Sequence, residues 1–172
     1  MDDDNDTAGG PAAALPAGRF TGPVDFQQLV RAALARAAQE GWRELILCDP
    51  DFADWPLGER AVAESLGAWS ASGRRCTLLA CRYDQVVVRH ARFVTWRRAW
   101  SHIIDARACQ AGDLLEFPSA IWTPAWAMQR QDLERCNGYA GKEPERRLAL
   151  KENLQEWLAK SGPSFAATTL GL

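Results

Sequence analysis

Apolar residues from position 23 onward follow two patterns that alternate along the chain. Helical spacing of apolar residues predicts helices over 23–41, 58–72, 84–100 and 144–160. Short apolar runs predict strands over 45–48, 75–82, 102–109, 120–123 and 126–130. Because predicted helices and strands alternate along the chain, the pattern predicts an α/β fold with a mostly parallel or mixed sheet flanked by helices.

The two ends of the chain differ from this pattern. Residues 1–22 combine an acidic run with Ala, Gly and Pro, which predicts a disordered tail. The remainder, residues 23–172, is expected to form a single α/β domain. Its last segment, 164–172, is apolar enough to pack back on that domain.

Two stretches late in the chain carry turn and edge signals. Pro124 cannot donate a hydrogen bond to a central ladder, so the two strands around it are expected near an edge of the sheet. Residues 134–144 are rich in turn formers and predict a loop, with Asn137 and Gly138 as the strongest turn signal.

Helix 84–100 has apolar residues on two of its sides, which differs from an ordinary surface helix. Such an element is expected to lie between the sheet and a second surface, either the C-terminal segment or another subunit. The chain also has eight tryptophans, for which core packing and subunit contact are favoured over base stacking. Both features predict a homodimer.

Composition excludes some classes of partner. The net charge of −2 gives no overall attraction to nucleic acid or to anionic membranes. There is no apolar run long enough to span a membrane, and the first residues are acidic, so a cytoplasmic location is expected. The five cysteines form no CxxC pair, which favours reduced core thiols. Neither a metal nor a cofactor is expected.

Three aspartates follow the first predicted strand. In open α/β sheets ligands bind outside the carboxyl ends of the strands, which makes Asp49, Asp51 and Asp54 candidate ligand-binding residues. The run "LILCDPDF" resembles the start of the active site in haloacid-dehalogenase-like phosphatases, whose first Asp is a nucleophile and whose second is an acid. That resemblance implies a metal-dependent phosphatase-like hydrolase. The alternative is that these side chains cap the next turn or pair with arginines.

A second resemblance covers residues 24–172. The segments "LILCDPDF", "VVVRHARFVTWRRAWSHIIDAR" and "EPERRLALKENLQEWLAKS" resemble phospholipase-D-like domains, in particular an uncharacterised proteobacterial branch. The resemblance implies the phospholipase-D-like fold. Active members use a His-x-Lys-x4-Asp motif, in which the His attacks the phosphorus and the Lys neutralises the phosphoryl oxygens.

This chain departs from that motif at both of its histidines. His90 is followed by Arg92 and Arg97 where the motif has Lys and Asp, and His102 by Ile104 and Cys109. We therefore expect no catalytic residues and a catalytically silent member of the family, more a binding or interaction module than an enzyme. The ligand, a small molecule or a protein partner, is unknown, and the candidate residues that would bind it on this helix are His90, Arg92 and Arg97.

The basic residues of helix 84–100 scatter around its circumference instead of forming a stripe. A single run of phosphates does not reach all of them, so nucleic acid is not expected as a partner. We predict instead that at least one of Arg89, Arg92 and Arg97 pairs with a carboxylate near the carboxyl edge of the sheet, where the acidic loop offers Asp49, Asp51 and Asp54, because a buried arginine needs a counter-charge.

Overall fold

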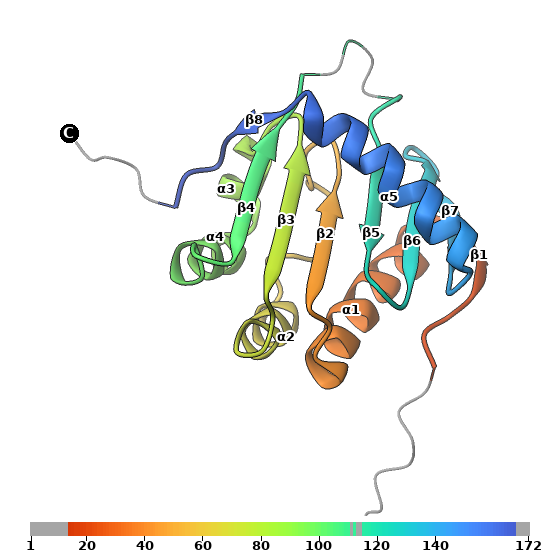
Figure 1. Cartoon of the computed structure of the whole chain (residues 1–172), viewed down its shortest axis with the longest axis horizontal. Coiled ribbons are helices and arrows are strands. Elements are labelled where there is room, and N and C mark those ends of the chain that lie inside the picture. Colours follow the sequence, from red (N-terminus) through yellow and green to blue (C-terminus); the bar gives the residue numbers. More distant parts are fainter. Residues whose placement is uncertain (1–13, 111, 113–114, 168–172) are drawn as a thin grey trace, which may run out of the picture.

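A single mixed sheet connects all the other elements. The computed structural model of the protein describes residues 14–110, 112 and 115–167. In this part of the chain eight strands follow the order β1-β7-β6-β5-β2-β3-β4-β8 (Figure 1). The strands are β1 (Gly18–Phe20), β2 (Glu44–Cys48), β3 (Arg75–Ala80), β4 (Ile104–Ala108), β5 (Ser119–Trp122), β6 (Ala127–Asp132), β7 (Asn137–Gly141) and β8 (Gly162–Pro163). The predicted α/β fold with a mixed sheet is confirmed.

The centre of the sheet is parallel and its two sides are antiparallel. β2 pairs with β3, and β3 with β4, in parallel. β5 joins the other side of β2 in antiparallel orientation, followed by β6 and β7. Because layers cover both faces of β2 and β3, nearly every position of these strands is buried. This explains why both strands read as continuous apolar runs in the sequence.

The helices form two layers, one on each face of the sheet. They are α1 (Gly22–Glu40), α2 (Arg60–Ser70), α3 (Asp84–Arg89), α4 (Ala91–Ala99) and α5 (Pro144–Ala159). Leu45 and Leu47 of β2 pack in one core with α1 to α4, whereas Ile46 and Cys48 pack in a second core with α5 (Figure 1). Neighbouring residues reach different cores because side chains alternate along a strand. None of the helices in the described part of the chain is long and apolar enough to cross a membrane.

The N-terminal boundary differs from the prediction. Residues 1–13 of the predicted tail lie outside the described residues, but Gly18–Phe20 forms β1 and pairs with β7. Leu15 and Phe20 are buried in the larger core. Three residues are too few to show a strand periodicity, so only the pairing with β7 reveals this strand.

The predicted loop at 134–144 contains a strand. Asn137–Gly141 forms β7, which pairs with β6 on one side and β1 on the other. Gly138 is needed there for close packing, since a Cβ at this position would lie 2.1 Å from the carbonyl oxygen of Gln129. The glycine that suggested a turn instead permits the backbones of two strands to approach.

The strands around Pro124 lie inside the sheet, contrary to the prediction that they lie near an edge. β5 has β2 and β6 as neighbours, and β6 has β5 and β7. Pro124 itself falls in the turn between β5 and β6, where no ladder hydrogen bond is lost. β1 and β7 extend the sheet beyond β6 and so move the edge outward.

The predicted helix 84–100 is broken into two. His90 has φ −124° and ψ 58°, which ends α3 and starts α4. Phe93 and Trp96 of α4 enter the core, and Phe165 of the C-terminal segment covers the outer side by stacking on Tyr83 at 4.8 Å. The second surface expected for this element is therefore the chain's own C-terminal segment. Residues 168–172 of that segment lie outside the described residues.

Candidate functional site

Asp49 lies directly after β2 and is buried, with 2% of its surface exposed. Its Oδ1 accepts hydrogen bonds from Ser119 Oγ at 2.6 Å and from Arg130 Nη2 at 2.8 Å. Its Oδ2 accepts from the backbone N–H groups of Asp51 at 3.2 Å and Phe52 at 2.8 Å. Four donors therefore occupy the two carboxylate oxygens.

Arg130 of β6 supplies the counter-charge. Its side chain is 2% exposed, and its Nη1 lies 2.5 Å from Asp54 Oδ2. Its Nε donates to Ser119 Oγ at 3.1 Å, and its guanidinium lies 4.2 Å from the centre of the Phe26 ring. Arg130, Asp49, Asp54 and Ser119 thus form a closed network of charges and hydrogen bonds, which we call the Asp49–Arg130 cluster.

The electrostatics of this cluster follow from burial and pairing. Burial raises the pKa of the Asp49 carboxyl, while the charge of Arg130 and the hydrogen bond from Ser119 act against that rise. Burial alone would lower the pKa of Arg130, but the hydrogen bond to Asp54 and the charge of Asp49 raise it above its ordinary value. Arg130 is therefore a permanent cation, and the two carboxylates are its counter-ions.

Asp51 caps the turn that follows β2. Asp51 Oδ1 accepts a hydrogen bond from the N–H of Ala53 at 3.0 Å, and Asp51 Oδ2 lies 3.6 Å from Arg82 Nη2. Phe52, between Asp51 and Ala53, has φ 56°, a left-handed conformation that turns the chain sharply. The aspartates cap this turn and pair with arginines, as the alternative in the sequence analysis stated.

The candidate residues of helix 84–100 do not meet the aspartates through their side-chain charges. His90 is 5% exposed, and its Nε2–H donates to the carbonyl oxygen of Phe52 at 2.8 Å. Arg92 Nη1 donates to the carbonyl oxygen of Gly58 at 2.9 Å. Arg97 is buried and its Nε donates to the carbonyl oxygen of Phe165 at 3.1 Å.

The prediction that one of these arginines pairs with a carboxylate is wrong. Arg89 donates to the side-chain oxygen of Gln85, and within the described residues neither Arg92 nor Arg97 forms an ion pair. In the acidic loop, Asp49 instead pairs with Arg130, and Asp51 pairs with Arg82. Burial lowers the pKa of Arg97, and electrostatic interactions with Tyr83, Asp105 and Cys76 offset that effect only in part.

Ser119 and Arg130 belong to the cluster but do not appear among the residues that the sequence suggested. The alternation of side chains between the two faces of β6 could have indicated that Arg130 is buried. Met128 and Arg130 are two positions apart, so both point to the face that α1 covers. A charged residue on the apolar side of a strand requires a buried counter-charge. Asp49 was a candidate for that counter-charge, because it directly follows an apolar run in the sequence.

The thiols take no part in a disulfide. All five cysteines lie within the described residues, and none of them forms a disulfide. Burial raises the pKa of Cys48 and of Cys76, so neither is ionised near neutral pH. Within the described residues no three His, Cys, Asp or Glu side chains are gathered as a metal site would require.

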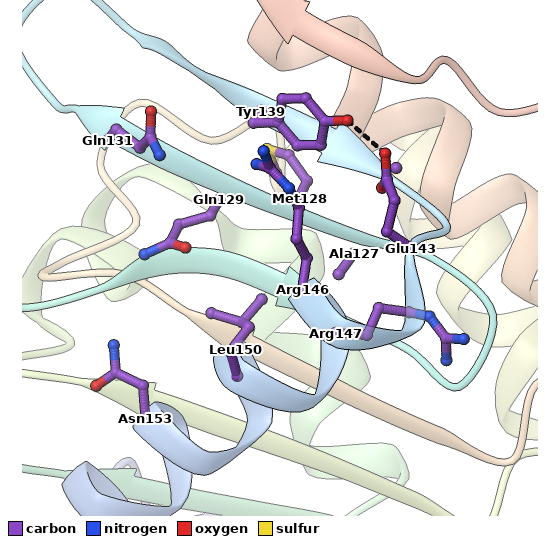
Figure 2. A pocket seen from close by; sticks show the side chains of 12 residues that line it. Ala127, Met128, Gln129, Gln131, Tyr139, Glu143, Arg146, Arg147, Leu150 and Asn153 are labelled. Carbon is purple, nitrogen blue, oxygen red and sulfur yellow. Dashed lines mark hydrogen bonds between the residues drawn. The ribbon is translucent and has the colours of Figure 1, made fainter.

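Open space lies elsewhere, on the sheet face that α5 only partly covers. One cavity of about 270 Å³ lies between α5 and strands β6 and β7 (Figure 2). A second cavity of about 380 Å³ continues it toward β1 and shares Gln131, Tyr139 and Arg146 with it. We call the two together the β6–β7 trough. The side chains that matter for its chemistry are Arg19, Gln129, Gln131, Tyr139, Arg146 and Asn153.

Tyr139 and Arg146 form the ridge between the two cavities. The Arg146 guanidinium lies 3.8 Å from the centre of the Tyr139 ring. The Tyr139 hydroxyl donates to Glu143, as Figure 2 shows, and this bond raises the pKa of Tyr139 and lowers that of Glu143. Arg147 points away from the trough and donates to the carbonyl oxygen of Pro124.

Comparisons with known proteins give similarity of fold. No family model matches the chain, and no curated protein matches its sequence. The structure of TrmBL2, an archaeal chromatin protein with a novel mode of DNA binding, is similar with a TM-score of 0.62 and 13% identity over 88% of this chain. Phosphatidylserine synthase from Haemophilus influenzae is similar with a TM-score of 0.53 and 13% identity over 90% of this chain.

At 13% identity, both similarities concern the fold and not the family. Phosphatidylserine synthase is a phospholipase-D-like protein. The likeness is one of fold. The chain spans about half the length of the structures that it matches, 55% of TrmBL2 and 40% of the synthase.

Proposed function

We propose that this chain is a phospholipase-D-like domain that binds a ligand or partner without the hydrolytic chemistry of that family. The observation that carries the proposal is that Asp49 and the Nε2 of His90 are engaged in structural hydrogen bonds. Asp49 accepts four of them, and the Nε2 of His90 is held by the carbonyl oxygen of Phe52. A nucleophile must be free to reach the substrate, which neither group is.

The other histidine supports the same proposal. His102 precedes β4, at the end of the sheet opposite to Asp49. The chain's three lysines are Lys142, Lys151 and Lys160, and Lys151 of α5 is 3.4 Å from Glu44 at the start of β2. His102 and Lys151 therefore lie at the opposite end of the sheet from the carboxyl ends of the parallel strands, and neither histidine has a lysine two positions after it.

The rival function is a metal-dependent phosphatase-like hydrolase at Asp49 and Asp51. Such an enzyme holds a divalent cation that offsets the repulsion between carboxylate and phosphate. The donor set does not fit that use, because Arg130 and Ser119 already occupy the Oδ1 of Asp49 and two backbone amides its Oδ2. The positive charge beside this carboxylate is a guanidinium.

The ligand of the proposed module is best accommodated by the β6–β7 trough. It is open, it offers aromatic, amide and guanidinium groups, and its walls come from three strands and one helix. The small ligand or protein partner expected from the sequence is proposed to bind there instead of at the Asp49 loop. Because a chromatin protein of similar fold binds DNA, nucleic acid is retained among the ligands to be tested.

The test is a comparison of wild type with Asp49→Asn, Asp51→Asn and the exposed control Asp25→Asn. Each is assayed with bis(p-nitrophenyl) phosphate and p-nitrophenyl phosphate, in EDTA and in Mg²⁺ or Mn²⁺. We expect no turnover above the blank for any of them. A metal-dependent rate that the control retains and the other two variants lose would overturn the proposal. Asp51→Asn keeps the test valid if Asp49→Asn does not fold, because Asp51 is only partly buried.

A further inference from the structure

Three residues of the trough lie side by side across three strands. Arg19 of β1 is paired with Tyr139 of β7, and Tyr139 with Gln129 of β6. Further along, this row continues through Ala120 of β5 to Cys48 of β2, both of which α5 covers. The outer three side chains therefore point to the same face of the sheet but lie beyond the cover of α5.

Tyr139 is held in place before any ligand arrives. Its hydroxyl is bonded to Glu143, and Arg146 lies against its ring. An aromatic ring and a guanidinium plane on a sheet face form a surface on which nucleobases stack. The fixed ring loses little conformational entropy on binding, which favours affinity.

The two cations of the trough are available to an anion. Within the described residues neither Arg19 nor Arg146 has a carboxylate within ion-pair distance. Glu143 is bonded to Tyr139, and its pKa is lowered by that bond and, to a smaller extent, by the charge of Arg146. Asp132 lies beside Arg135. Arginine binds phosphate through paired N–H groups, so these two side chains provide the chemistry for a phosphate on either side of Tyr139.

Amide groups complete the lining. The side chains of Gln129 from β6 and Asn153 from α5 lie on the same open cavity, and Gln131 lies on both cavities (Figure 2). Amides donate and accept hydrogen bonds at once, which matches the edge of a nucleobase. The volumes of about 270 and 380 Å³ bring the joined trough into the range of roughly 300–1,000 Å³ that ligand sites occupy.

We infer that the β6–β7 trough binds a nucleotide unit, with its base stacked at Tyr139 and its phosphate held by Arg146 and Arg19. This inference rests on the proposed binding function and names its ligand class. It also departs from the sequence-based expectation that nucleic acid is not a partner, which rested on the net charge of −2 and on the scattered arginines of helix 84–100. The unit comes either from a free mononucleotide or from single-stranded nucleic acid, and both present the same base and phosphate.

The experiment measures binding of both sources to the full chain. Calorimetry is done with AMP and UMP, and fluorescence anisotropy with labelled six-nucleotide U and dT strands at two salt concentrations. We expect Tyr139→Ala to weaken binding by about 10-fold to 100-fold. Arg146→Ala should reduce the salt dependence by about one charge. Tyr139→Phe, which keeps the ring but loses the bond to Glu143, should bind more weakly than wild type but more tightly than Tyr139→Ala. Arg98→Ala, an exposed arginine outside the trough, should bind as wild type does.

The possible results identify the source of the nucleotide and distinguish a failure of this inference from a failure of the proposed binding function. Equal affinity for mononucleotide and strand identifies a free nucleotide, and tighter binding of the strand identifies nucleic acid. No binding of any of these probes, or binding that Tyr139→Ala leaves unchanged, overturns the inference and leaves the binding function standing. Hydrolysis of the probes, followed by chromatography after incubation, would instead overturn the proposed function. Circular dichroism of each variant confirms that it is folded.

Discussion

At the scale of residues, the most consequential contact is the one between Asp49 and Arg130. Both side chains are 2% exposed, and each would be costly in the interior without the other. Ser119 bonds to both of them, and the ring of Phe26 lies against the guanidinium. The cluster joins the end of β2 to β6 across the intervening β5, so it holds the loop after β2 in one conformation.

We predict that Arg130→Met lowers the free energy of unfolding by about 3–5 kcal/mol, because Asp49 is left buried without a counter-charge. The control is Arg135→Met, whose side chain is 79% exposed and lies 4.0 Å from Asp132. That variant should stay within about 0.5 kcal/mol of wild type. Urea denaturation measures both. The double variant Arg130→Met with Asp49→Leu should recover part of the loss, and an Arg130→Met protein as stable as the control would contradict the account.

A second residue-scale prediction concerns the thiols. Titration with a thiol reagent in denaturant and without reductant should return all five cysteines. In the native protein near pH 8, Cys48 and Cys76 should not react, because burial raises the pKa of each thiol and blocks access of the reagent. A denatured count of three, or zinc bound in stoichiometric amount, would show that the thiols are used in another way.

At the scale of elements, the break between α3 and α4 follows from tight packing at His90. A Cβ on Gly58 would lie 2.9 Å from the carbonyl oxygen of Arg89 and 3.2 Å from His90 Nδ1, so the loop before α2 presses on the junction. The His90 ring then reaches the carbonyl oxygen of Phe52. The C-terminal segment closes the other side, where Phe165 stacks on Tyr83.

We predict that Arg97→Ala lowers stability by about 1–2 kcal/mol through the lost bond to Phe165 and lost packing of its stem. Oligonucleotide affinity should not change, since Arg97 lies outside the trough. Thermal denaturation and anisotropy measure the two quantities, with the exposed Arg98→Ala as control. Phe165→Ala should be non-additive with Arg97→Ala because the two residues are in contact. Weaker oligonucleotide binding by Arg97→Ala at unchanged stability would contradict this structural role.

At the scale of the whole molecule, the two faces of the sheet are covered unequally. Four helices cover one face, and α5 covers the other only in part, which leaves the trough open (Figure 1). The tryptophans add little to the exposed surface, because six of the eight are buried: Trp42, Trp55, Trp69, Trp96, Trp122 and Trp126. The exposed apolar side chains that remain on α3 are Val87 and Val88.

The homodimer stays a prediction, and the structure directs it to α3. Val88 is 78% exposed and Val87 58%, so a self-association driven by apolar burial should involve them. Light scattering of the wild type at tens of micromolar should give twice the monomer mass, and Val88→Glu should return the monomer. Leu148→Glu, at a site 60% exposed on α5, should leave the dimer intact. A wild type that scatters as a monomer at that concentration would remove the prediction.

Local patterns were sufficient to predict the elements whose buried residues lie close together in the sequence. The apolar spacing in α1, α2 and α5 and the apolar runs of β2 and β3 arise within a few consecutive residues, so periodicity alone predicts them. Gly41 ends α1 in a left-handed conformation, with φ 62°, which a helix stop signal anticipates.

Features that arise from contacts between distant segments could not be predicted from local patterns. Asp49 and Arg130 are 81 positions apart, and β1 and β7 acquire strand structure only by pairing with each other and with β6. The burial of a charge and the edge of a sheet are properties of the folded chain, since each depends on which segments become neighbours. For the same reason the site that we propose differs from the one that the sequence suggested. Arg130 occupies the Asp49 loop, and the open trough is assembled from β1, β6, β7 and α5.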